Sequence, residues 1–196
     1  MVGVLVEGRA GVVALACYPC QPFEAAAMKA CLKIDGALLD TIRDDLRRPH
    51  AFAHERVGFV TAGIIALATG DLTLLARDYR PVADNDYLRD MNVGAMIGPD
   101  AMRKGLQLAY GARSALLHVH THGGRGAPDF SGVDLSESQK FVPSFFNVVP
   151  YMPHGIVVLS DTSARGLLWL GPKMAAVPVL EFVRVGAPYA RFGAAR

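Results

Sequence analysis

The 196-residue chain lacks a strong charge of either sign, because 20 lysines and arginines nearly balance 18 aspartates and glutamates. It also lacks any block of five or six like charges. Proteins that bind nucleic acid normally carry a basic patch, so the composition gives no support to that function class. No G-x-G-x-x-G follows a strand-like run, which disfavours a doubly wound nucleotide-binding fold.

Cysteine is scarce, and the odd number of three offers no disulfide framework, which suits a reducing cytoplasm. The N-terminus lacks the basic start and the long apolar run of a signal peptide. The longest uncharged stretch, residues 141–160, contains Pro143, Pro150 and Pro153, which a membrane-spanning helix tolerates poorly. We therefore expect a cytoplasmic protein without a membrane or nucleic-acid partner.

The chain is 52% hydrophobic, enough to bury the core of one domain over residues 1–196. Within it we expect a hairpin and a helix in 1–49, a core in 50–170, and a closing strand and tail in 171–196. The sequence pattern says nothing about the oligomeric state.

Apolar residues recur at roughly helical spacing from Phe23 to Arg48, where Gly36 interrupts the predicted helix. Two further helices are predicted, at 99–113 and 131–142. Strands are predicted in the opening hairpin and in later pairs, at 2–6, 12–18, 57–68, 72–79, 114–119, 156–159, 166–170 and 177–185. Residues 80–98 carry turn chemistry and predict a loop or insertion. Helices between strand pairs favour an α/β (α+β) fold with helices packed on a mixed sheet.

Three of the six histidines fall within five residues, at His118, His120 and His122. Alternate residues of a strand point to one face, so His120 and His122 can reach the same metal ion. Neutral imidazoles suit Zn²⁺, and Asp134, beyond a glycine-rich loop, offers a carboxylate as the third ligand. Three protein ligands leave the fourth position open for water, as in a catalytic zinc site.

The string Ser131-Gly-Val-Asp134 is also a helix capping-box pattern, and most such matches only begin helices. The two interpretations are compatible, because the first turn of a helix favours the ionised aspartate that a metal requires. We expect His118 to be packed or to support a ligand rather than to bind the ion.

These residues resemble the JAMM (MPN-plus, JAB) zinc metalloproteases, whose signature is a distant Glu, then His-x-His, a loop and Ser-x-x-Asp. His120-Thr-His122 and Ser131-Gly-Val-Asp134 look like that signature, and Glu55 in Glu-Arg-Val-Gly fits the distant Glu. The resemblance implies a single mixed, curved β-sheet flanked by helices, as in JAMM and cytidine-deaminase-like proteins.

The same resemblance implies a deubiquitinase-like isopeptidase in which His120, His122 and Asp134 hold Zn²⁺. Glu55 would act as general acid–base, and Ser131 would stabilise the oxyanion. The implied substrate is a peptide or isopeptide bond after the C-terminal tail of ubiquitin or a ubiquitin-like protein, in a bacterial setting. We expect residues 80–98 and 145–153 to form the walls of the groove for that tail.

Two departures from the family pattern concern the loop. Gly123 stands where the family usually has proline after the second histidine, and the loop to Asp134 is one residue longer than usual. Pairing His118 with His120 instead would need a still longer loop, so we reject that register.

Three other functions remain as alternatives. A non-catalytic JAMM-fold scaffold would typically have lost ligands, whereas all of them are present here. A RadC-like protein of nucleic-acid context fits the neutral charge poorly. Cys17-Tyr-Pro-Cys20 is a C-x-x-C motif that permits a redox role, although the βαβ order typical of thioredoxin-like proteins is missing.

Overall fold

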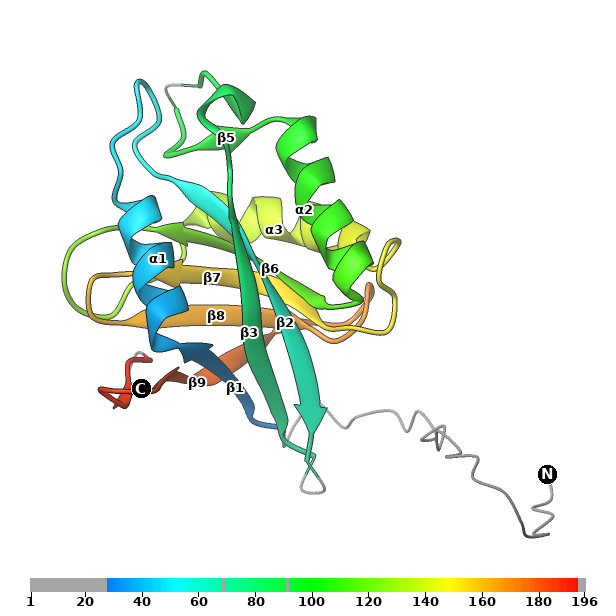
Figure 1. The fold of residues 1–196 in the computed structure, drawn as a ribbon. Coiled ribbons are helices and arrows are strands. Elements are labelled where there is room, and N and C mark those ends of the chain that lie inside the picture. Colours follow the sequence, from blue (N-terminus) through cyan, green and yellow to red (C-terminus); the bar gives the residue numbers. More distant parts are fainter. Residues whose placement is uncertain (1–27, 68–69, 91, 194–196) are drawn as a thin grey trace, which may run out of the picture.

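The structure is a computed structural model that describes residues 28–67, 70–90 and 92–193 (Figure 1). Its strands are β1 (Ala30–Asp35), β2 (Val57–Ala66), β3 (Leu72–Pro81), β4 (Tyr87–Leu88), β5 (Met96–Ile97), β6 (Ala115–Thr121), β7 (His154–Leu159), β8 (Ala164–Trp169), β9 (Val177–Val185) and β10 (Ala190–Arg191). The helices are α1 (Gly36–Leu46), α2 (Pro99–Ala112), α3 (Gly132–Phe145) and the short 3-10 helix η1 (Asp84–Asp86). The expected opening hairpin at 2–6 and 12–18, with Cys17 and Cys20, lies outside the described residues.

The main sheet closes on itself. Its strand order is β1-β3-β2-β6-β7-β8-β9-β10, and β1 also pairs with β9 in parallel, for example Leu32 with Phe182. Within the described ranges the protein is therefore a closed seven-stranded mixed barrel with three α-helices, and β10 is added to β9. The expectation of a single mixed, curved β-sheet flanked by helices was wrong, because the β1–β9 pairing leaves the barrel without open edges.

The strand that closes the barrel lies inside the segment predicted as one long helix. Between Phe23 and Arg48 only Gly36–Leu46 is helical among the described residues, and Ala30–Asp35 is a strand. Ala30, Leu32 and Ile34 are buried while the intervening side chains are more exposed, which is the period of a strand. Gly36, predicted as an interruption, is where α1 begins, because the Asp35 carboxylate accepts hydrogen bonds from the first-turn N–H groups of Ala37 and Leu38.

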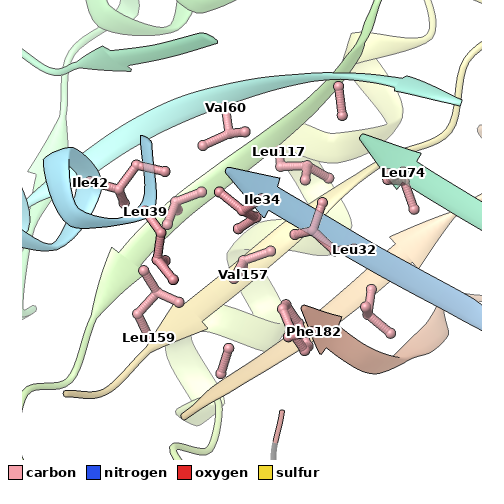
Figure 2. Close-up of a cluster of buried hydrophobic side chains, with 14 of the residues drawn as sticks. Leu32, Ile34, Leu39, Ile42, Val60, Leu74, Leu117, Val157, Leu159 and Phe182 are labelled. Carbon is pink, nitrogen blue, oxygen red and sulfur yellow. The ribbon is translucent and has the colours of Figure 1, made fainter. Parts of the chain in front are cut away.

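The interior of the barrel is an apolar cluster to which all seven strands contribute (Figure 2). Helix α1 adds Leu39, Ile42 and Leu46, each almost fully buried. The strand residues of this interior cluster include Leu32, Ile34, Val60, Leu74, Leu117, Val119, Val157, Leu159, Leu168 and Phe182.

A second apolar cluster lies outside the barrel wall and includes residues of α2 and α3. Figure 1 shows these two helices beside the sheet. Phe59 of β2, Leu116 of β6 and Ile156 of β7 point into it from the strands, and Val142 and Phe145 from α3. The other predicted elements are confirmed to within a few residues, although 80–98 also contains η1 and the small β4–β5 sheet. Among the described helices, none has the length and apolarity needed to cross a bilayer.

Candidate metal centre

Strand β6 and the residues after it bring the two predicted histidine ligands together. The side chains of Leu117 and Val119 enter the interior cluster, so His120 points to the opposite face, where it is 3% exposed. His122 follows the strand, and its N–H donates to the carbonyl of Leu159, 3.1 Å away. The Nε2 atoms of His120 and His122 lie 3.2 Å apart, close enough to bind one ion.

Asp134 faces this histidine pair from the first turn of α3. Its Oδ1 lies 3.4 Å from Nε2 of His120, and its Oδ2 lies 3.3 Å from Nε2 of His122. Oδ2 also accepts hydrogen bonds from the backbone N–H and the hydroxyl of Ser131, at 2.7 and 2.8 Å. Oδ1 accepts neither of these bonds, which makes it the oxygen better placed to bind a metal.

Glu55 reaches the same point from the loop before β2. In the antiparallel β2–β6 pair, Val57 lies opposite His120, so the residue two positions earlier arrives beside His122. Oε1 of Glu55 is 3.8 Å from Nε2 of His122. The backbone N–H of Glu55 donates to the carbonyl of Gly94 at 3.1 Å, and a Cβ added to Gly94 would lie 2.5 Å from the Glu55 carboxyl carbon.

Glu55, His120 and His122 form a group that could hold a metal ion, since one ligand atom from each lies within 4.8 Å of the others. Asp134 adds a second carboxylate at comparable distances. The buried Nδ1 of His120 has no hydrogen-bond partner among the described residues, so this imidazole is held mainly by packing and by its Nε2 contacts. Two imidazoles and two carboxylates are a donor set that suits zinc and other transition metals.

The protonation states of the surrounding groups suit a cation. Burial opposes the charged form of Asp134, but hydrogen bonds from His120 and Ser131 outweigh it and hold the pKa of that carboxyl well below its usual range. Burial, with a smaller effect of His120, lowers the pKa of His118 to about 3, so His118 is neutral at physiological pH.

Ser131, predicted to stabilise an oxyanion, is the N-cap residue of α3. Its hydroxyl accepts a hydrogen bond from the Asp134 N–H at 3.1 Å and donates its proton to Oδ2 of the same residue. In this arrangement Ser131 fixes the aspartate, and the oxyanion role, which remains a prediction, would require the hydroxyl to rotate.

The glycine-rich loop between His122 and Ser131 is folded back and tied to the β7–β8 turn. Gly123, Gly124 and Gly126 all have positive φ, a conformation that residues with side chains rarely adopt. The hydroxyl of Ser160 donates to the carbonyl of Gly126 at 2.6 Å, and the N–H of Asp161 to that of Gly124 at 2.9 Å. Glycine after the second histidine is therefore compatible with an anchored loop.

A cavity of about 400 Å³ opens beside the metal group. Glu55, His120 and Asp134 line it, and so does His118, which packs against Phe141 with ring centroids 5.0 Å apart. Of the two segments expected to wall a substrate groove, 80–98 contributes lining residues to this cavity. None of the described residues of 145–153 lines it.

Sequence reasoning missed Arg56, which anchors the backbone segment that carries Glu55. Arg56 is 2% exposed, and its guanidinium donates to the carbonyls of Arg48 and Pro49 at 2.7 and 2.9 Å. It also pairs with the Asp84 carboxylate at 2.7 Å. An arginine beside a glutamate at a predicted strand entry has the sequence signature of a solvated charge, so only the three-dimensional contacts reveal this anchor.

No family model and no curated protein matches the chain. Among solved structures, the chain is similar to the STIL N-terminal domain of Trichoplax adhaerens, with a TM-score of 0.34 and 6% sequence identity. The match covers 70% of this chain and 41% of that one, so the chain spans about two fifths of the length of that structure. A likeness at this level carries no conclusion about fold or function.

Proposed function

We propose that this protein is a zinc-dependent peptidase or isopeptidase that cleaves a bond after the C-terminal tail of a ubiquitin-like protein. The observation that carries the proposal is the convergence of two imidazoles and two carboxylates from three separate segments, with neighbouring ligand atoms 3.2 to 3.8 Å apart. The assignment of the substrate rests on the resemblance of Glu55, His120, His122, Ser131 and Asp134 to the JAMM signature.

His120, His122 and Asp134 are proposed as the protein ligands, and Glu55 as the general base. Zinc held by such a set would polarise a scissile carbonyl and would lower the pKa of a bound water toward neutrality. Oε1 of Glu55 lies 3.8 Å from Nε2 of His122, the longest separation within the group, which favours Glu55 as the residue that takes the proton of the attacking water. It then passes that proton to the leaving amine.

The competing assignment makes Glu55 a ligand, because it belongs to the group that could hold a metal ion. The two assignments differ in what Glu55→Gln does. If Glu55 is the base, the amide variant keeps the metal and loses activity. If Glu55 is a ligand, the variant loses the metal and the activity together.

The test combines metal quantification with hydrolysis of a ubiquitin-like fusion and of an isopeptide conjugate, using wild type, Glu55→Gln and His120→Ala. We expect about one zinc per chain in wild type and in Glu55→Gln, with hydrolysis slowed about 10²- to 10⁴-fold in the latter. His120→Ala should lose both zinc and activity. Undiminished hydrolysis by Glu55→Gln, or full zinc content in His120→Ala, would overturn the proposal.

A further inference from the structure

The cavity beside the metal group has a chemistry that the proposed reaction does not explain. We infer that it is a subsite for a bulky apolar side chain on the residue next to the scissile bond, a specificity that rests on the proposed function. Its volume of about 400 Å³ lies within the range of small-ligand pockets in proteins.

The position of the cavity ties it to the reacting bond. Glu55, His120 and Asp134 belong to its lining, whereas His122 does not, so the cavity extends to one side of the metal group. A substrate whose carbonyl lay at that group would have a neighbouring side chain within reach of this space. A cavity that shares three residues with the metal group is therefore a subsite of that group.

The walls are apolar and come from five parts of the fold. Nine of the fourteen lining residues carry aliphatic, thioether or aromatic side chains. They include Val57 of β2, Ile156 of β7, Met102 of α2, Phe141 of α3, and Ala95 and Ile97 at β5. Because these segments also pack against the second apolar cluster, the cavity is a gap at the edge of a firm core.

The polar groups of the lining discriminate against charged side chains. Glu137, with a side chain 54% exposed, pairs with Lys140 at 2.7 Å and belongs to the solvent-facing rim. The carboxylates of Glu55, Asp134 and Glu137 would repel an acidic side chain. His118 makes no hydrogen bond within the described part of the chain, and its Nδ1 is buried without a partner. The same carboxylates would attract a basic side chain, but Glu55 and Asp134 face the histidine pair and Glu137 already pairs with Lys140. A basic side chain would therefore lose its hydration against the apolar walls without gaining a carboxylate of its own.

Filling this space should give a measurable preference. Transferring a leucine-sized side chain from water into such a site, compared with glycine, is worth about 10- to 100-fold in affinity. The preference should depend on the walls of the cavity and not on the metal group itself.

The probes are N-acetyl amino-acid hydroxamates of leucine, glycine, glutamate and lysine, whose hydroxamate group chelates zinc. Their affinities for the zinc-loaded full chain are measured by calorimetry. The same residues are placed on either side of the scissile bond in short peptides, and the rates are compared. The peptide series separates a subsite on the acyl side from one on the amine side.

The cavity variants are Ala95→Phe, which fills the space, and Met102→Ala, which enlarges it. The matched control is Met152→Ala, since Met152 is also partly buried against the second apolar cluster but does not line the cavity. We expect the leucine-to-glycine ratio to fall below about 3-fold in Ala95→Phe and to stay within about 2-fold of wild type in Met152→Ala. Met102→Ala should shift the preference toward larger aromatic side chains, and it remains informative if Ala95→Phe does not fold.

Equal binding of the leucine and glycine probes by wild type would overturn the inference, as would a preference for the glutamate or lysine probe. A leucine preference without hydrolysis of any substrate would overturn the proposed function and keep the subsite. Failure to bind zinc would overturn both.

Discussion

The two faces of β6 differ in kind, although they alternate along seven residues of one strand. Ala115, Leu117 and Val119 face the barrel interior, where they complete an apolar cluster to which every barrel strand contributes. His118 and His120 face outward, where the buried Nδ1 atom of each has no hydrogen-bond partner among the described residues and a cavity remains open. The side chains of the inward face belong to a buried apolar cluster, whereas those of the outward face border a cavity beside the candidate metal site.

The adjoining strands follow the same division. On β2, Val60 enters the interior cluster, whereas Val57 lies beside the metal group and lines the cavity. On β7, Val157 faces inward and Ile156 lines the cavity. The closed barrel therefore supports the candidate metal group on the outer face of its wall, an arrangement that keeps such side chains in place.

The strongest test of this comparison is a pair of substitutions three residues apart. Leu117→Ala should lower the free energy of unfolding by about 2 to 5 kcal/mol, because it leaves a void in a buried apolar cluster. Its zinc content at saturating zinc should not change. His120→Ala should do the reverse, weakening zinc binding more than about 100-fold with a smaller effect on the metal-free fold.

Chemical unfolding of the metal-free proteins and zinc titration of the folded ones give the two quantities separately. Equal effects of both substitutions on both quantities would show that the two faces are not independent.

Ser131→Ala tests how the outward face is organised. The hydroxyl and the Asp134 carboxylate hold each other in the capping box, so we expect zinc affinity to fall about 10- to 100-fold. Loss of the cap should also lower the free energy of unfolding by about 1 kcal/mol. Zinc titration with Ser136→Ala as the control, an exposed serine of the same helix, separates this effect from a general weakening of α3. Unchanged zinc affinity would mean that Asp134 is not a ligand or needs no orientation.

Asp35→Ala tests the inward face through α1. The Asp35 carboxylate accepts hydrogen bonds from Ala37 and Leu38 at 2.9 and 3.4 Å, so its removal should lower the free energy of unfolding by about 1 kcal/mol. Zinc affinity, which depends on the outward face, should remain at the wild-type value. Asp35→Asn serves as the control, because asparagine is also a good N-cap residue. A loss of zinc binding in Asp35→Ala would contradict the division between an inward face that stabilises the fold and an outward face that binds zinc.

The smallest effect is expected for His118→Leu. This imidazole is neutral and makes no hydrogen bond within the described ranges, so an apolar replacement should change the free energy of unfolding by less than about 1 kcal/mol. Zinc affinity should stay within about 3-fold of wild type, because residues beside a metal site affect it strongly only when they orient a ligand. A larger loss in a zinc titration would identify His118 as a residue that supports or binds the metal.

Local patterns were enough to predict that His120, His122 and Asp134 meet. The i, i+2 spacing of His120 and His122 works because β6 is a strand, and Ser131 begins a helix as its capping box predicts. Glu55 was placed through the family signature, and the β2–β6 register supplies the physical reason that it lies beside His122. The anchoring roles of Arg56 and Gly94 could not be predicted, because both depend on contacts with segments distant in sequence.

The closed barrel was missed for a single local reason. In Ala30–Asp35, buried residues alternate with more exposed ones, but the stretch is short and runs directly into the genuine helix α1. Over six residues, the hydrophobic period of a strand (2) is hard to distinguish from that of a helix (3.6). The strand was therefore predicted as part of the helix. Without that strand the remaining strands predict an open sheet. The missed strand is therefore the reason that the predicted fold class was wrong.

The parallel pairing of β1 with β9 also has a consequence for biosynthesis. Leu32 emerges from the ribosome long before Phe182, its partner, so among the described strands one edge of β1 has no partner until β9, the last barrel strand, is made. Pairings so distant along the polypeptide form slowly, because the intervening segment must first be ordered. We therefore expect nascent chains stalled before β9 to expose a hydrogen-bonding edge and to need a chaperone, whereas chains stalled after it should not.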